Sequence, residues 1–140
     1  MTIGLQVTID AEDPHRLARF WAEAVGYTKE DHSAVVDSLV AAGRLPAEEV
    51  VEVDGGRGFR DVAACRDPDG TRPRLFFQRV PERKTVKNRV HLDLHVGQER
   101  AEAEAERLVG LGATPLWRTT DRGGLTVTLQ DPEGNEFCVE

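Results

Sequence analysis

The stretch Asp131-Pro132-Glu133-Gly134 runs directly into Glu136-Phe137-Cys138-Val139, a turn motif followed by a strand-like segment. The same order occurs earlier in the chain, where Asp67-Pro68-Asp69-Gly70 precedes Leu75-Phe76-Phe77-Gln78. In such turns proline presets one φ angle and glycine accepts a positive one. Two copies of the same ending within 140 residues indicate an internal repeat.

Each of these endings has a matching beginning of strand and helix. In the first, residues 5–10 alternate apolar and polar side chains, as a half-buried strand does, and Asp13-Pro14 then begins a helix that stops at Gly26. In the second, residues 89–96 alternate in the same way, and a helix is expected over 99–111. The repeated unit therefore reads βαβββ, and the chain is predicted to have an α+β fold.

The repeat divides the chain into two modules of unequal length. We expect the first module at residues 1–80, a polar linker at 81–87 and the second module at 88–140. A helical insertion at about 32–53 accounts for the greater length of the first module.

The insertion carries apolar residues beyond what two bare modules need, namely Val35, Val36, Leu39 and Val40. Large exposed apolar patches usually mark interaction sites, so this surface is expected to pack on its own module or on a partner. Pairing of identical chains about a twofold axis is the commonest assembly, and we expect a homodimer.

Charge and composition restrict what the protein binds. The net charge of −7 argues against nucleic acid, which requires a basic surface. No run approaches the roughly 20 apolar residues of a membrane helix. The first residues enter a strand pattern rather than a basic region followed by an apolar core, so we expect no signal peptide and a cytoplasmic location.

The two cysteines, Cys65 and Cys138, match no metal-binding spacing such as C-x-x-C. In a reducing compartment they are expected to be free thiols.

Several segments in a fixed order carry a resemblance to a known family. They are Asp13-Pro14 to Gly26-Tyr27, the Asp67–Gly70 turn, Lys87–Leu94, Leu111–Thr114 and Asp131–Cys138. Together they resemble a glyoxalase-like domain of the vicinal-oxygen-chelate superfamily, which includes glyoxalases, bleomycin-resistance proteins and extradiol dioxygenases. The resemblance implies two βαβββ modules whose strands form a curled mixed sheet, a half-barrel, with the helices outside and a central pocket.

Strand alternation predicts which side chains face that pocket. The apolar face of each strand must pack beneath the helices, so the opposite face carries the polar residues. The predicted ligand pocket consists of Gln6, Thr8, Phe76, Gln78, His91, Asp93, Glu136 and Cys138. A polar face of a curled sheet suits a small organic ligand.

The resemblance also implies where metal-dependent members hold a divalent ion, with His or Gln on the first strand of each module and Glu on the last. Gln6 and His91 match the first positions, but Gln78 and Cys138 stand where glutamates are expected. Hard divalent ions favour anionic oxygen ligands, so we expect no tightly bound metal. A Cys138 thiolate with His91 suits Zn²⁺, although two neutral amides would complete a poor set. A metal, if bound, would use Gln6 and His91 with Glu136 or Glu140.

Three functions fit these residues. One is a metal-using lyase, isomerase or dioxygenase of the superfamily, and another is a metal-free enzyme or a regulatory partner domain. His91 is a candidate general base. The third is a metal-free protein that binds a drug or metabolite without catalysis, as resistance members of this fold do. The basic stretch Arg83–Arg89 is either a solvated loop or a recognition element for an anionic ligand group. Fold alone does not choose between these functions.

Overall fold

The computed structural model describes residues 1–140 and contains two units of the same topology. The first comprises β1 (Gln6–Ala11), α1 (Pro14–Val25), β2 (Thr28–Lys29), β5 (Val62–Arg66) and β6 (Arg74–Arg79), with sheet order β1-β6-β5-β2. The second comprises β7 (Asp93–Leu94), α3 (Ala101–Leu111), β8 (Thr114–Thr119), β9 (Thr126–Gln130) and β10 (Glu136–Val139), with order β7-β10-β9-β8. Because the two orders are equivalent, the predicted α+β fold with a duplicated βαβββ unit is confirmed.

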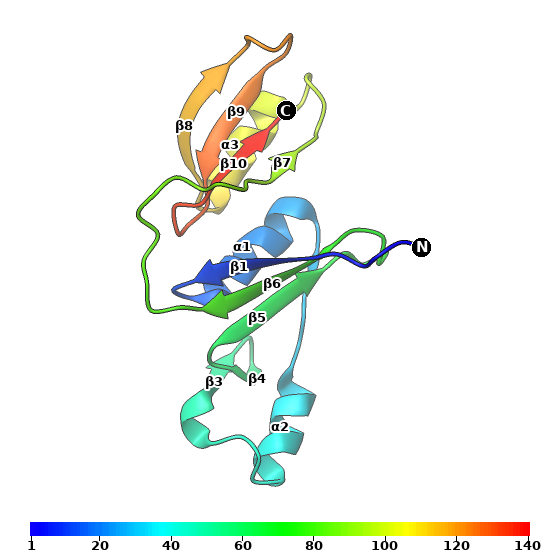
Figure 1. The fold of residues 1–140 in the computed structure, drawn as a ribbon, viewed down its shortest axis with the longest axis vertical. Coiled ribbons are helices and arrows are strands. Elements are labelled where there is room, and N and C mark those ends of the chain that lie inside the picture. The colour runs from blue at the N-terminus through cyan, green and yellow to red at the C-terminus, as the bar shows by residue number, and fades with distance from the viewer.

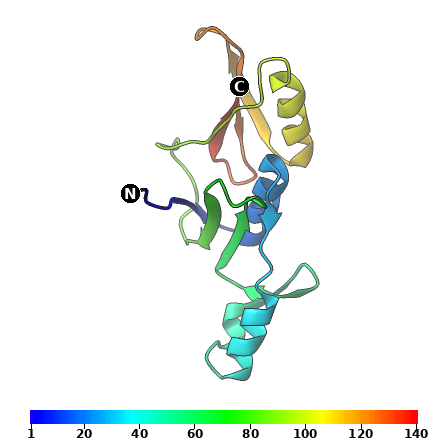
Figure 2. The ribbon, with the colours of Figure 1, turned by 90° about the vertical axis from the view of Figure 1, so that its right-hand side faces the viewer.

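The two sheets lie one beyond the other and are not closed into a barrel (Figure 1). In each sheet the first strand runs parallel to the last and occupies an edge. Helices α1 and α3 lie on the same side of the sheets (Figure 2), so the opposite faces carry no helix. These uncovered faces carry the polar side chains of the strands.

Helix α1 begins and ends as its sequence predicts. The Asp13 side chain accepts a hydrogen bond from the Arg16 amide at 3.1 Å, Pro14 occupies the first turn, and Gly26 ends the helix with φ 71°. Its apolar face places Phe20 and Trp21 in the core.

One hydrophobic core runs through both units. Phe20 and Trp21 of α1 make edge contacts with Phe137 of β10, with ring centroids 6.1 and 5.1 Å apart. The Arg107 guanidinium of α3 donates to the carbonyls of Glu23 and Ala24 at the end of α1. The second unit is therefore fixed to the first through α1.

The strand predicted over residues 89–96 is much shorter than expected. Only Asp93–Leu94 forms β7, although the Cys138 amide still donates to the Leu92 carbonyl and the Glu140 amide to the Leu94 carbonyl. As an edge strand, β7 can pair only with the short β10, so the ladder does not reach Val90, which is exposed.

The segment between β2 and β5 contains more than a helix. Helix α2 (Ser33–Ala41) and a 3₁₀ turn (Ala47–Glu49) are followed by a hairpin of β3 (Val50–Val53) and β4 (Gly56–Phe59). The hairpin turns at Asp54-Gly55, both with positive φ, a sequence typical of tight hairpins. None of the helices has the length and apolar composition of a membrane-spanning segment.

Candidate functional site

The uncovered face of the second sheet forms a cavity of about 610 Å³. Strand register brings Asp93, Cys138, Thr128 and Trp117 into one row across the four strands. Trp117 is half exposed on the edge strand β8 and is the large aromatic surface of the cavity. Other lining side chains are His91, His95, Lys87, Gln98, Thr126, Glu136 and Glu140.

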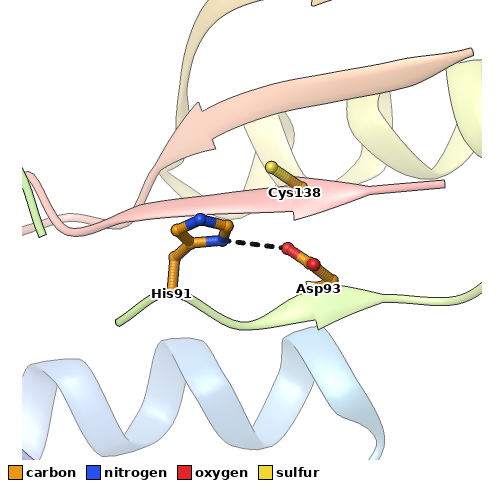
Figure 3. Close-up of side chains that lie close together, drawn as sticks. All are labelled: His91, Asp93 and Cys138. Carbon is orange, nitrogen blue, oxygen red and sulfur yellow. Dashed lines mark hydrogen bonds and ion pairs between the residues drawn. The ribbon is translucent and has the colours of Figure 1, made fainter. Parts of the chain in front are cut away.

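His91 and Asp93 form a hydrogen-bonded pair on this face (Figure 3). The His91 Nδ1 and Asp93 Oδ1 atoms are 3.0 Å apart, and both side chains are partly exposed. An ionised carboxylate only accepts hydrogen bonds, so Nδ1 carries the proton and Nε2 keeps a lone pair in the neutral ring. The sequence places these residues on the same face; the structure adds the bond between them.

Cys138 lies beside this pair, on the neighbouring strand. Burial raises the pKa of its thiol and the nearby Asp93 carboxylate adds to the effect, against a hydrogen bond with Thr128 at 3.5 Å that lowers it. Cys138 is therefore a neutral thiol at neutral pH, and the free protein does not present it as a thiolate nucleophile.

Glu136 is buried at the border of the cavity. Burial disfavours its charge, but hydrogen bonds from the Asn88 amide at 2.9 Å and from Lys84 outweigh it and lower the pKa of the carboxyl to about 2. This carboxylate fixes the chain leading into β7, and Lys84 of the basic stretch is used in the fold. Lys87 of that stretch lines the cavity.

Glu140 and His95 form a second pair farther along the same face. His95 Nδ1 lies 3.2 Å from Glu140 Oε1, and Thr126 donates to the other Glu140 oxygen at 3.4 Å. His95 is largely exposed.

The first sheet presents a different polar face. The Gln6 carbonyl oxygen accepts a hydrogen bond from Arg74 at 2.9 Å, and Arg74 is held by two hydrogen bonds to Glu30. The Arg74 guanidinium also lies over the Phe76 ring, 5.1 Å from its centre. The Gln78 amide donates to Asp10 at 3.0 Å.

The predicted pocket residues thus fall into two groups within one chain. His91, Asp93, Glu136 and Cys138 line the cavity on the second sheet. Gln6, Phe76 and Gln78 do not line it. Thr8 lines a larger crevice between the two units, of about 1110 Å³, which His91 and Glu136 also border. A common pocket for both groups remains a prediction.

Sequence reasoning left Thr126, Thr128 and Lys87 out of the pocket. The alternation of Thr126 and Thr128 with apolar neighbours was the signal that could have placed them on this face. The sequence also predicts His15 on a helix surface with no role, which is wrong as to its position. It is buried, and its Nε2 lies 2.7 Å from the Phe59 carbonyl oxygen, a contact with the hairpin that no local pattern predicts.

Comparison with family models assigns residues 6–140 to the glyoxalase-like domain. The chain belongs to this family, within the vicinal-oxygen-chelate superfamily. Comparison with curated proteins gave no match.

Solved structures support the fold of the family. The fosfomycin resistance protein FosX from Mesorhizobium loti is 15% identical with a TM-score of 0.65, over 100% of this chain and 92% of that one. A glyoxalase/bleomycin resistance protein/dioxygenase family enzyme from Burkholderia phytofirmans is also 15% identical, with a TM-score of 0.61 over 96% and 94% of the chains. A FosX variant from Listeria monocytogenes, complexed with Mn(II) and dihydroxypropylphosphonic acid, is 12% identical with a TM-score of 0.62 over 100% and 90%.

The residues at the metal positions implied by the family do not fit a hard divalent ion. The four residues at these positions are Gln6, Gln78, His91 and Cys138. Gln6 and Gln78 are neutral amides, and the Gln6 oxygen already accepts a hydrogen bond from the Arg74 cation. His91 and Cys138 supply no carboxylate. Glu136, considered from sequence as a substitute, is held by Lys84 and Asn88, and Glu140 is paired with His95.

Proposed function

We propose that this glyoxalase-like protein binds a small organic ligand on the uncovered face of its second sheet. The observation that carries the proposal is the cavity of about 610 Å³ lined by His91, Asp93, Cys138 and Trp117. Ligand sites in proteins typically measure about 300–1,000 Å³ and combine apolar surface with a few polar groups. The Trp117 ring offers the flat apolar surface, and the strands offer the polar groups.

Lys87 and Arg122 also line this cavity, beside the carboxylates of Asp93 and Glu140. A ligand carrying its own anionic group would meet Lys87 or Arg122, and its hydroxyl or carbonyl oxygens would meet His91. We therefore propose a small oxygen-rich compound with one acidic group. One fosfomycin resistance protein among the structural neighbours is complexed with a compound of that general kind, dihydroxypropylphosphonic acid.

Catalysis is the second candidate, and one observation favours it. The Asp93 carboxylate accepts a hydrogen bond from the Nδ1–H of His91, which leaves the Nε2 atom as a proton acceptor. A histidine oriented by a carboxylate is a common general base. Proton abstraction of this kind would suit a lyase or isomerase.

We also propose that the protein acts as a homodimer in the cytoplasm. Gln6, Phe76 and Gln78 lie outside both cavities that His91 lines in one chain, and a second copy could bring its first sheet over the second sheet of its partner. Both edge strands that would face such a partner, β1 and β7, have one unpaired edge. Both cysteines are free, which suits a reducing compartment.

A thermal-shift screen tests ligand binding directly. The panel contains small phosphonates, 2-oxo acids, hydroxy acids and catechols, each measured against wild type, Trp117→Ala and Leu116→Ala. Leu116 is the neighbouring exposed residue, and it does not line the cavity. A compound that stabilises wild type and Leu116→Ala but binds Trp117→Ala at least about tenfold more weakly, a loss of about 1.4 kcal/mol, supports the proposal. Equal binding to all three proteins would contradict it.

A further inference from the structure

Three side chains of different chemistry converge on the second sheet. His91, Asp93 and Cys138 each offer one metal-binding atom, and these atoms all lie within 4.8 Å of one another. His91 and Asp93 come from the chain at β7, and Cys138 comes from the adjacent β10 (Figure 3). Cys138 and Asp93 are direct partners in the strand register, so the backbone itself sets their spacing.

The donor set is unlike that of a hard metal site. It combines an imidazole nitrogen, a carboxylate oxygen and a sulfur, and Zn²⁺ is the common biological ion that accepts all three. With zinc bonds of about 2.0–2.3 Å, ligand atoms in a tetrahedral site lie roughly 3.5 Å apart. For His91 and Asp93 both to bind the ion, the hydrogen bond between them is replaced by two bonds to the metal and the imidazole proton moves to Nε2. Side-chain rotation then brings the three atoms, already within 4.8 Å of one another, to this spacing.

Charge also balances at this cluster. When the Cys138 thiol gives its proton to solvent, one thiolate and one carboxylate neutralise the two positive charges of zinc, and the imidazole stays neutral. The site faces the cavity lined by Trp117 and Thr128, so the fourth position of the ion stays open to water or to a ligand oxygen.

We propose that His91, Asp93 and Cys138 form a zinc site confined to the second sheet. This set replaces the family arrangement, in which both modules supply ligands. Gln6 takes no part because its oxygen is bound by the Arg74 cation, whose charge would repel a second cation. Asp93 supplies the carboxylate, and its hydrogen-bond partner His91 is a ligand of the same ion, whereas Glu136 and Glu140 are held by groups outside the cluster.

Cobalt substitution tests the site without any organic ligand. Metal-stripped protein is titrated with Co²⁺, which reports a thiolate ligand by an intense near-ultraviolet charge-transfer band and a tetrahedral site by its visible spectrum. We expect one Co²⁺ per chain with both signatures, and displacement of Co²⁺ by Zn²⁺.

Matched variants identify the ligands. Cys138→Ser should lose the charge-transfer band, and His91→Ala and Asp93→Asn should weaken binding by at least about tenfold, since even outer-shell partners of a metal typically contribute that much. Gln6→Ala, on the first sheet, should bind as wild type does. Circular dichroism melts confirm that each variant is folded.

A measurement on wild type needs no variant. Zn²⁺ should slow alkylation of Cys138 by iodoacetamide, measured by mass spectrometry, relative to the unfolded protein and to the protein without metal. Cys65 is fully buried in the first sheet and serves as the internal thiol control, with no change on adding zinc.

Absence of stoichiometric Co²⁺, a charge-transfer band that survives Cys138→Ser, or a loss in Gln6→Ala as large as that in Asp93→Asn would each overturn the zinc site. The metal site shares a face with the proposed ligand site but is tested by metal alone. Failure of the metal titration therefore leaves the proposed ligand function standing, and failure of the ligand screen leaves the zinc site standing.

Discussion

The Trp21 indole donates a hydrogen bond of 3.1 Å to the Asp131 carboxylate, and both side chains are buried. Trp21 belongs to the first helix, and Asp131 begins the turn that leads into β10. The same turn makes a second contact with the first unit. The Glu133 carboxylate accepts hydrogen bonds from the backbone amides of Glu12 and Asp13. The turn motif of the second unit thus positions β10, with Cys138, against the helix of the first.

Removal of this hydrogen bond should destabilise the whole chain. Trp21→Phe keeps an aromatic ring but leaves a buried carboxylate without one donor, and we expect a loss of about 1.5–3 kcal/mol in the free energy of unfolding. Urea denaturation measures it. Trp117→Phe, at a half-exposed site, should change stability by less than about 0.5 kcal/mol. Equal stabilities for the two variants would show that the Trp21–Asp131 bond contributes nothing.

Acid should weaken the fold through two carboxyls. Contacts with Arg74, and then with His32, lower the pKa of Glu30 to about 2, as the contacts of Glu136 lower its own to about 2, both from an ordinary value of 4.5. Their stabilisation is present above pH 4.5 and is lost as the pH falls from 4.5 towards 2.

Denaturation at a series of pH values checks this dependence. Glu136→Gln and Glu30→Gln should be less stable than wild type at pH 7, and the difference should shrink below pH 4.5. Glu106→Gln, on the exposed face of α3, should follow wild type at every pH. A difference between Glu136→Gln and wild type that stays constant down to pH 2 would refute the role of the ion pair.

The proposed homodimer could form through one of two surfaces. Val36 of the insertion is buried in its own chain and Val35 is 47% exposed, whereas Leu5 before β1 and Val90 before β7 are 72% and 80% exposed. We expect the partner to cover Leu5 and Val90, because burial of large exposed apolar residues drives association. Leu5→Asp and Val90→Asp should each shift sedimentation at micromolar concentration towards monomer.

Val35→Asp is the control for this surface, since it places the same charge on the insertion. It should sediment as wild type does. Dissociation by Val35→Asp alone would place the interface on the insertion, and a monomeric wild type would remove the homodimer altogether.

Much of the fold could be predicted from sequence, because the turns and caps are local. Asp13, Gly26 and the Asp131–Gly134 turn each dictate backbone geometry by themselves. The β3–β4 hairpin could not be predicted in the same way. Gly56 and Gly58 have no side chains, so β4 lacks the alternation of apolar and polar residues that indicates a strand. The length of β7 depends on how many residues of β10 pair with it, and β10 lies more than 40 residues away in the chain.

The candidate site divides in the same manner. Alternation placed His91, Asp93 and Cys138 on one face, and the structure brings them together. The partners of Gln6 and Glu136 come from residues far along the chain, Arg74 and Lys84. Such long-range pairs follow from packing of the whole fold, so sequence periodicity could not assign them.

Backbone amide chemical shifts test the proposed ligand face most directly. A compound that stabilises wild type in the thermal-shift screen is titrated into ¹⁵N-labelled protein. The account predicts that the largest changes occur at His91, Asp93, Thr128 and Cys138, with saturation at one ligand per chain. Changes confined to the crevice between the units, at Val7 to Asp13, or to the insertion, with the second sheet unaffected, would contradict it.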